Sequence, residues 1–334
     1  MNWRMKFMPW EDEDSNSINR YYPIKSGQIR LSQYMWDLID KTQSEALKKQ
    51  FIPQNRISKQ IFSDDYLREE DYTPIPHLIH RYKNKALIIA TNQCACYCQF
   101  CTRQRITQKG ELSLDNLMKI TDYIKTHPEI NDVLITGGDP LTLKTSRLIT
   151  ILEEIEKIEN VKILRIGTRI PITLPQRVDS KLIKALSGFS NLYINIHINH
   201  PDELTEDSKK AILSLANAGI PLGSQSVFLK GVNDDISTLK RLFEELVTIK
   251  VKPYYLYQCD KVKGCEEFIA DARKGIDIIN KLCNQISGFA LPKFVVDTPE
   301  LGKMVLAPCS VDRINHNLIY LSNGNDRCIY NSPE

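Results

Sequence analysis

The sequence of 334 residues contains no apolar run close to the roughly 18 residues that a membrane-spanning helix needs. Its N-terminus has Trp3, Arg4 and then the acidic run 11–14, and lacks the apolar centre of a signal peptide. It also lacks a strong charge imbalance, because 44 Lys and Arg are interspersed with 41 Asp and Glu, and the net charge is +3. A nucleic-acid-binding face is therefore not indicated. We expect a cytoplasmic globular protein that binds neither membranes nor nucleic acid.

The nine cysteines are an odd number, and the cytoplasm keeps thiols reduced, so we expect metal or redox chemistry rather than disulfides. Four of them lie within eight consecutive residues, directly after the apolar run 86–90, which predicts a buried strand. Cys94, Cys98 and Cys101 have the spacing C-x3-C-x2-C, and a loop leaving a strand can fold back so that three thiolates converge. Cys96 is an additional thiol that we do not expect to be a ligand.

Three thiolates can hold a cubane 4Fe-4S cluster while one iron stays open to a small chelating molecule. The alternative is a zinc site in a structural or interaction protein without catalysis. Structural zinc normally takes four ligands in two spaced pairs, and no second Cys/His pair with that spacing lies near the loop. The spacing therefore favours the iron-sulfur cluster.

From residue 86 onward, short β-branched runs alternate with longer amphipathic segments, which is typical of β-α units around a parallel sheet. The expected strands are 86–90, 132–136, 162–167, 192–197, 222–228 and 252–258, with later runs at 293–297, 305–306 and 318–321. The expected helices are 31–39, 43–49, 114–126, 146–158, 180–186, 206–218, 236–249 and 270–286. Six units about 30 residues apart predict an α/β fold with a partial (β/α)6 parallel barrel rather than an open twisted sheet.

Three segments follow from this pattern. Residues 1–80 are expected to be an N-terminal helical and extended segment, in which Pro74 and Pro76 mark an extended approach to the first strand. Residues 81–287 would form the barrel and 288–334 a C-terminal covering segment.

In parallel barrels, functional residues gather at the carboxyl ends of the strands. Those ends carry the cysteine loop, Gly137-Gly138-Asp139, Gly167-Thr168-Arg169, His197, Ser224-Gln225-Ser226 and Asp260. Polar and titratable side chains are therefore expected on a single rim.

The cysteine spacing after the first strand, with Phe100 just before the last cysteine, resembles that of the radical S-adenosylmethionine (SAM) enzymes. In those enzymes an electron from the cluster breaks the sulfonium carbon–sulfur bond of SAM and gives a 5′-deoxyadenosyl radical. Gly137-Gly138-Asp139-Pro140 is similar to the family's glycine-rich segment, whose backbone meets the SAM amino group, and glycine permits that close approach. The resemblance also implies that His197 and Gln225 help to seat SAM.

Further motifs, in order between residues 35 and 325, resemble lysine 2,3-aminomutase. They are Cys101-Thr102-Arg103, Leu174-Pro175-Gln176-Arg177, His197-Ile198-Asn199-His200-Pro201, Gln225-Ser226-Val227, Gly231-Val232-Asn233-Asp234, 253–260 and Phe294-Val295-Val296-Asp297. The resemblance implies migration of an amino group between C2 and C3 of an amino acid. SAM and the cluster would be the radical source, and pyridoxal 5′-phosphate (PLP) would carry the nitrogen.

The resemblance also implies a PLP site. Lys303 falls where the family has the lysine that forms a Schiff base with PLP, although the preceding loop is one residue shorter and poorer in glycine. Arg81, Tyr82 and Lys85 match the positions that hold the PLP phosphate. Lys85 replaces an arginine there, and it can still neutralise phosphate as a point charge without the bidentate fork.

Arg103 is implied to bind the substrate carboxylate, because a planar guanidinium pairs two oxygens at once. Asp260 and Asp297 match the acidic pair that receives the lysine ε-ammonium group. Two acids at the ends of neighbouring apolar runs favour a cationic substrate side chain over a carboxylate, so a glutamate-specific enzyme is disfavoured.

We therefore expect an isomerase that interconverts L-lysine and L-β-lysine. Two alternatives remain open: the family branch that makes β-lysine to modify elongation factor P, and the same chemistry on arginine or ornithine. An electron donor such as flavodoxin or ferredoxin and a homodimer are the expected partners. The sequence ends at Glu334, before the cysteine-bearing extension that binds zinc in longer members, so we expect no such zinc site.

Overall fold

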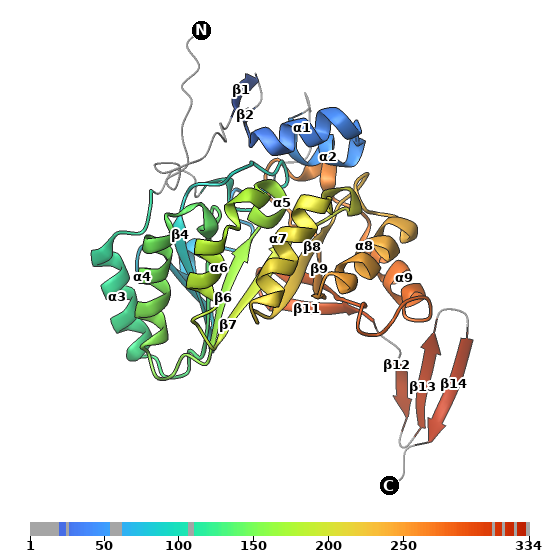
Figure 1. The fold of residues 1–334 in the computed structure, drawn as a ribbon. Coiled ribbons are helices and arrows are strands. Elements are labelled where there is room, and N and C mark those ends of the chain that lie inside the picture. The colour runs from blue at the N-terminus through green and yellow to red at the C-terminus, as the bar shows by residue number, and fades with distance from the viewer. Residues whose placement is uncertain are drawn as a thin grey trace.

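The computed structural model describes residues 20–24, 27–53, 62–105, 110–308, 311–315, 318–323 and 326–331. Its centre is a nine-stranded sheet in the order β11-β10-β9-β8-β7-β6-β5-β4-β3, with the helices packed around it (Figure 1). The strands are β3 (Leu78–Tyr82), β4 (Lys85–Thr91), β5 (Asp132–Gly137), β6 (Ile163–Thr168), β7 (Leu192–His197), β8 (Leu222–Phe228), β9 (Val251–Gln258), β10 (Lys293–Thr298) and β11 (Gly302–Ala307). The expected α/β fold with a mostly parallel sheet is confirmed.

The six strands predicted for the barrel are present as β4 to β9, with ends within one residue of the expected positions. β10 extends the parallel part of the sheet by pairing with β9, so the sheet continues past residue 287. β3 pairs antiparallel with β4, where the prolines at 74 and 76 predict only an extended approach. The pairing of β3 depends on a contact with the following strand that proline positions do not encode.

The main helices are α3 (Leu114–Lys125), α4 (Thr145–Glu156), α6 (Ser180–Leu186), α7 (Glu206–Asn217), α8 (Ile236–Thr248) and α9 (Ala272–Leu282). Most begin at a polar side chain that accepts a hydrogen bond from the first turn, as Thr205 does from the Ser208 N–H. Each buries one apolar stripe against the sheet; in α8 it is Leu239, Leu242, Phe243 and Leu246, all fully buried. Helix α9 is shorter than the expected 270–286.

The sheet does not close into a complete barrel. Its two edge strands, β3 and β11, are not hydrogen-bonded to each other as neighbouring strands in the described sheet. Side chains link these edges instead. The Arg81 guanidinium donates hydrogen bonds to the carbonyl oxygens of Thr298 and Pro299 in the β10–β11 hairpin, the latter at 2.9 Å. The Lys303 N–H donates to the Tyr82 hydroxyl at 3.1 Å. The structure is thus a partial barrel whose seam consists of side-chain contacts.

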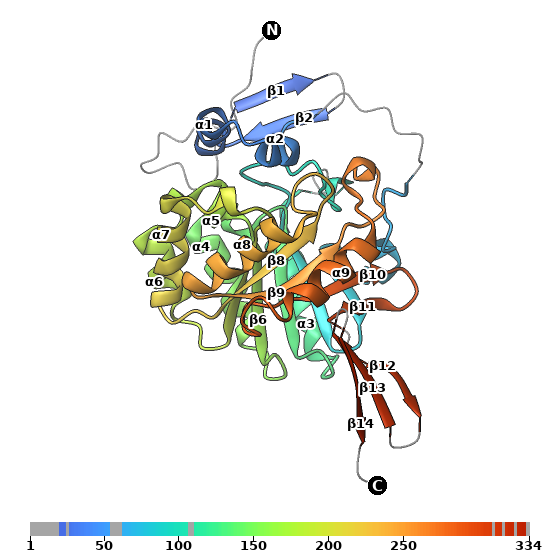
Figure 2. The same cartoon turned by 90° about the vertical axis from the view of Figure 1, so that its right-hand side faces the viewer.

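The N-terminal segment comprises β1 (Arg20–Ile24), β2 (Gly27–Leu31), α1 (Gln33–Thr42) and α2 (Glu45–Phe51), and lies at the end of the sheet that carries the cysteine loop (Figure 2). The loop is bound to it through the backbone. The Tyr97 N–H donates to the Arg30 carbonyl and the Gln99 N–H to the Gln50 carbonyl, each at 2.8 Å. The two expected helices are present, and the segment therefore braces the loop.

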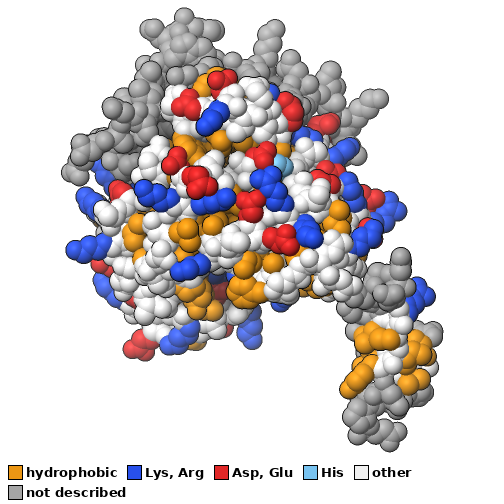
Figure 3. Space-filling model, turned by 45° about the vertical axis from the view of Figure 1, so that its right-hand side comes forward, with side chains coloured by type: hydrophobic (Ala, Val, Ile, Leu, Met, Phe, Trp, Pro, Cys, Tyr) orange, Lys and Arg blue, Asp and Glu red, His pale blue; other side chains and the backbone are white. Residues whose placement is uncertain are grey.

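A separate three-stranded antiparallel sheet, β12 (Val311–Asn315), β13 (Leu318–Asn323) and β14 (Asp326–Asn331), projects from the body (Figures 1 and 2). Figure 3 shows apolar side chains on its surface, among which Ile329 and Tyr330 are more than half exposed. Within the described ranges, none of the helices has the length and apolar character needed to cross a membrane.

Close packing of α9 on the sheet gives a test of the core. A Cβ on Gly275 would lie 2.6 Å from Phe294 Cε1 and 3.1 Å from Phe228 Cε1, whereas one on Gly288 meets nothing within 4 Å. Alanine in a helix normally gains about 0.5–1 kcal/mol over glycine, but overpacking a core costs about 1–3 kcal/mol. We predict that Gly275→Ala lowers the melting temperature and that Gly288→Ala leaves it nearly unchanged. Equal melting temperatures for the two variants would contradict this packing.

Candidate active site

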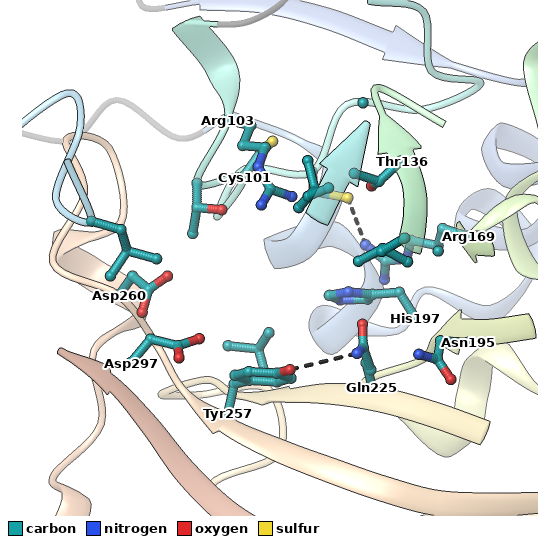
Figure 4. Close-up of a pocket in the computed structure, with 18 of the residues that line it drawn as sticks. Cys101, Arg103, Thr136, Arg169, Asn195, His197, Gln225, Tyr257, Asp260 and Asp297 are labelled. Carbon is teal, nitrogen blue, oxygen red and sulfur yellow. Dashed lines mark hydrogen bonds between the residues drawn. The ribbon is translucent and has the colours of Figure 1, made fainter. Parts of the chain in front are cut away.

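A pocket of about 420 Å³ opens at the carboxyl ends of the parallel strands. Figure 4 shows Asp260 and Asp297 on one side of it and Arg169 and His197 on the other. Every residue that the sequence assigns to a site lines this one pocket: Arg81, Tyr82, Lys85, Cys94, Cys98, Cys101, Arg103, Gly137, Gly138, Asp139, His197, Gln225, Asp260, Asp297 and Lys303. The fold thus brings together residues from both edges of the sheet.

Cys94, Cys98 and Cys101 lie in the loop after β4. Burial raises the pKa of all three thiols, that of Cys101 to about 12, because the thiolate is poorly solvated there. A bound metal would supply the positive charge that such thiolates need. Among the described residues, no three His, Cys, Asp or Glu side chains are placed to share a single metal ion. Thiolates of a cubane cluster ligate separate irons, so they need not converge on one ion.

Cys96 points elsewhere. Its sulfur accepts a hydrogen bond from the Ser32 N–H at 3.3 Å, in the N-terminal segment. Burial raises the pKa of its thiol to about 11. Cys96 therefore packs between the cysteine loop and Ser32, the residue that caps α1.

Glycine is required at the last residue of β5, Gly137, and at the next position, Gly138, because both make close backbone contacts with the start of the cysteine loop. A Cβ on Gly137, which has φ +138°, would lie 2.3 Å from the Thr91 carbonyl oxygen, and one on Gly138 would lie 2.2 Å from that of Gln93. The Gly138 N–H donates to Thr91 O at 2.7 Å and the Asp139 N–H to Gln93 O at 2.6 Å. A side chain at either glycine would push the two loops apart.

The Asp139 side chain is bound within the protein. Its carboxylate accepts hydrogen bonds from the Thr168 hydroxyl at 2.7 Å, the Arg169 N–H at 2.6 Å and the Leu141 N–H at 3.1 Å. Burial raises the pKa of Asp139 to about 6 despite these donors. Asp139 therefore links the loop after β5 to the end of β6. Its carboxylate is hydrogen-bonded to the protein itself.

His197, at the end of β7, stacks on Phe100 with ring centroids 5.6 Å apart. Its Nε2 is buried without a hydrogen-bond partner in the described structure, and the same is true of Asn195 Nδ2 on the same strand. Burial, with the nearby positive charge of Arg169, holds the pKa of His197 well below its usual value, so the ring is neutral. Unpartnered buried polar atoms on a pocket wall fit a polar ligand, because leaving them unpaired is costly.

Lys303 reaches the pocket from β11. The hairpin between Thr298 and Gly302 is tight, and it sets Lys303 opposite Asp297 across the β10–β11 ladder. The Lys303 ammonium donates to the Tyr257 hydroxyl at 2.8 Å and lies 3.9 Å from the Asp297 carboxylate. Burial is the main cause that lowers the pKa of Lys303. The shortened loop thus still directs the lysine into the pocket.

The expected phosphate-binding residues lie beside this hairpin, but Arg81 already has protein partners in the carbonyl oxygens of Thr298 and Pro299. The Lys85 ammonium lies 5.7 Å from the centre of the Tyr82 ring. Arg165, which the sequence analysis missed, also lines the pocket and pairs with Asp132 at 2.7 Å. Arg165 lies inside β6 rather than at its carboxyl end, so the rule that functional residues gather at strand ends does not single it out.

Arg103 has a partner that the sequence analysis missed. Its Nε and Nη2 donate to the carboxylate of Glu69, at 3.1 and 2.7 Å to Oε1. Glu69, only 7% exposed, also pairs with Arg105 at 2.8 Å. Arg103 therefore lines the pocket as expected, with one edge of its guanidinium occupied by a protein carboxylate. Glu69 lies outside every expected helix and strand, so no hydrophobic pattern in the sequence predicts its contact with Arg103.

Asp260 and Asp297 lie on the same side of the pocket (Figure 4). Burial and the nearby Asp297 charge raise the pKa of Asp260 to about 7. Two carboxylates in one pocket repel each other when both are ionised, and a cation placed between them relieves that repulsion. The geometry fits a positively charged ligand group at this end.

Comparison with known proteins identifies relatives of the chain. Residues 88–243 match the model described as the radical SAM superfamily. An L-lysine 2,3-aminomutase of Acetoanaerobium sticklandii is 38% identical over 324 residues, which are 95% of this chain and 78% of that protein. A glutamate 2,3-aminomutase of Clostridioides difficile is 41% identical over 240 residues, 71% of this chain and 57% of that one. A radical SAM methyltransferase structure from Sphaerobacter thermophilus has a TM-score of 0.49 at 14% identity, covering 66% of this chain and 68% of that one.

The raised pKa of Asp260 predicts a pH-dependent cost to stability. An unfolded aspartate titrates near 3.9, so the folded state binds the extra proton between about pH 4 and 7, and stability falls as pH rises through that range. Replacing Asp260 by Asn removes this cost. Without substrate, we predict that Asp260→Asn gains roughly 2 kcal/mol more over wild type at pH 8 than at pH 5, measured by thermal unfolding. The exposed-site control Asp277→Asn should show no such difference, and an equal gain at both pH values would contradict the assignment.

Proposed function

Because the chain belongs to the lysine 2,3-aminomutase family of the radical SAM superfamily, we propose that it interconverts L-lysine and L-β-lysine by moving the amino group between C2 and C3. The observation that carries the proposal is that one pocket contains both the three-cysteine loop and Lys303, with the acidic pair beside it. A radical source and a site for the amino group must be adjacent for such a migration, and this pocket meets that requirement.

The family implies three cofactors: a 4Fe-4S cluster, SAM and PLP. When bound, the cluster and SAM supply a carbon-centred radical and PLP carries the migrating nitrogen. We assign Cys94, Cys98 and Cys101 as the cluster ligands. Their spacing, common loop and partial burial in the pocket wall support this assignment.

We assign the SAM side of the pocket to Gly137, Gly138, Asp139, His197 and Gln225. The neutral His197 ring offers a buried Nε2 that lacks a partner, and the Gln225 amide lies 3.5 Å from the Tyr257 hydroxyl. The contribution of Asp139 would come through its backbone, because its carboxylate is fully used in joining two loops. These groups would orient SAM rather than react with it.

We assign Lys303 as the residue that binds PLP covalently. Its lowered pKa leaves more of the amine unprotonated at neutral pH, and an unprotonated amine is the nucleophilic form. The Tyr257 hydroxyl holds the amine in place at 2.8 Å. Arg81, Tyr82 and Lys85 would provide the phosphate side, with Arg165 adding positive charge to the same wall.

We assign the substrate's ε-ammonium group to Asp260 and Asp297 and its carboxylate to Arg103. Glu69 occupies the Nε edge of Arg103, so a substrate carboxylate would approach the Nη1 side. An acidic pair at the far end favours lysine over glutamate, whose side chain would place a third carboxylate there.

We also propose that the protein works in the cytoplasm, receives its electron from a flavodoxin or ferredoxin, and forms a homodimer. The need for a low-potential electron supports the donor class. The exposed apolar side chains of the projecting β12–β14 sheet support self-association, since a second copy could cover them (Figure 3).

The proposal is tested by anaerobic reconstitution with iron, sulfide, SAM and PLP, followed by chromatography of reactions on L-lysine, L-arginine, L-ornithine and L-glutamate. We predict β-lysine as the main product. Because Asp260 must be ionised to receive a cation, KM for lysine should fall as pH rises from 6 to 8. In Asp260→Asn, kcat/KM for lysine should drop about 10- to 100-fold, and the pH dependence should disappear.

Two lysine variants serve as controls for this assay. Lys303→Ala should lose both the product and the visible absorbance of bound PLP, whereas Lys281→Ala, in an exposed ion pair on α9, should retain both. Conversion of another amino acid with no β-lysine would refute the substrate assignment. Retention of the PLP absorbance in Lys303→Ala would refute the lysine assignment.

A further inference from the structure

Arg169, at the end of β6, is a buried arginine in direct contact with the cysteine loop. Its Nη1 donates a hydrogen bond to the sulfur of Cys98 at 2.8 Å, drawn as a dashed line in Figure 4. Its Nη2 donates to Gln50 Oε1 at 2.7 Å and to Glu203 Oε2 at 3.0 Å. Only 7% of the residue is exposed, so its orientation toward the sulfur is fixed by these partners.

Glu203 is held just as firmly. It is fully buried, and its Oε1 accepts hydrogen bonds from the Gln50 amide at 3.0 Å, the Asn199 N–H at 3.1 Å and the His200 N–H at 3.0 Å. The carboxylate cannot turn away from Arg169 without losing these donors. Gln50 comes from α2 and Asn199 from the end of β7, so three parts of the chain converge on this pair.

Stability alone does not account for the pair. A buried arginine–carboxylate pair is commonly no more stabilising than apolar residues of the same volume, because both charges lose their hydration. Arg169 Nε is also buried without a partner among the described residues. Its Nη1, by contrast, is directed at a sulfur that lies on the pocket wall. The guanidinium is thus oriented so that Nη1 contacts the Cys98 sulfur, while Nε makes no hydrogen bond within the described part of the chain.

Resting on the assignment of Cys98 as a cluster ligand, we propose that Arg169 is a positioning residue that sets the reduction potential of the cluster through its hydrogen bond to the Cys98 sulfur. The step concerned is a one-electron reduction from 2+ to 1+ by a low-potential donor of the ferredoxin or flavodoxin class, with no proton transferred. Reduction adds negative charge to the cluster and its sulfurs. A cationic donor stabilises that charge, so Arg169 raises the potential.

Glu203 limits this effect. Its negative charge lies beside the guanidinium and opposes the influence of Arg169 on the sulfur. Removing the arginine and neutralising the glutamate should therefore move the potential in opposite directions. A merely structural role for the pair predicts no such opposition.

The test is a redox titration of the anaerobically reconstituted holoenzyme, poised with dithionite and mediator dyes and followed by the electron paramagnetic resonance signal of the reduced cluster. Arg169→Met should lower the reduced-to-oxidised ratio at a fixed potential at least tenfold, a shift of about 59 mV to more negative values. Arg169→Lys, which keeps the charge but not the fork, should shift less in the same direction. Glu203→Gln should shift to more positive values.

Arg273→Met is the control, because it also removes one arginine charge but from an exposed ion pair with Asp271 on α9, and Arg273 is not among the residues that line the pocket. Its potential should stay close to that of wild type. Wild-type potentials in the Arg169 variants, or an equal shift in Arg273→Met, would overturn the proposal. If Arg169→Met fails to hold a cluster, Arg169→Lys and Glu203→Gln decide the matter by the direction of their shifts. Absence of any cluster in the wild type would instead refute the proposed function.

Discussion

Arg81 and Tyr82, on the edge strand β3, hold the β10–β11 hairpin of the opposite edge through hydrogen bonds to its backbone. The rest of the pocket depends on these contacts, because no strand pairing joins the two edges in the described sheet. The cysteine loop leaves β4 beside one edge, and Lys303 lies on the other. Side-chain contacts across an open seam thus bring together two groups that are about 200 residues apart in sequence.

The charges in the pocket are divided by position. Arg169 and Glu203 form a pair behind the cysteine loop, Arg103 and Glu69 form a second pair, and Asp260 with Asp297 leaves an excess of negative charge at the hairpin side. Paired charges keep their orientation without a ligand, whereas the repulsion within the acidic pair is relieved when Asp260 takes up a proton or when a cation binds beside it. This division of charge is consistent with the proposed binding of a substrate carboxylate at one end of the pocket and a substrate ammonium group at the other.

Much of the fold follows from the sequence, because hydrophobic period and spacing are local properties. The runs at 192–197 and 222–228 are the strands β7 and β8, with the same ends. Positions at strand ends follow from the same pattern, so the sequence alone predicts that Asp139, His197 and Asp260 lie on the rim, and all three line the pocket. Parallel strands direct all their carboxyl ends to the same edge.

The partners of those residues could not be predicted, because they depend on contacts between distant segments. Glu69 reaches Arg103 from a stretch without clear period, and Gln50 reaches Arg169 from α2. The requirement for glycine at 137 and 138 also differs from the expected one. The motif predicts close approach of a ligand to these glycines, whereas the atoms nearest to an added Cβ belong to the backbone of Thr91 and Gln93. Such tertiary contacts leave no trace in residue type or spacing.

The central claim is that SAM and the substrate's C3 meet in this single pocket, and isotope transfer tests it directly. The reconstituted enzyme would be incubated anaerobically with SAM and L-lysine deuterated at C3, and the adenosyl group analysed by mass spectrometry. When the amino group moves from C2 to C3, a hydrogen must leave C3, and the account assigns its removal to the radical that SAM supplies. It therefore predicts deuterium on the 5′ carbon of the adenosyl group. Formation of β-lysine with no deuterium in the adenosyl group would contradict it.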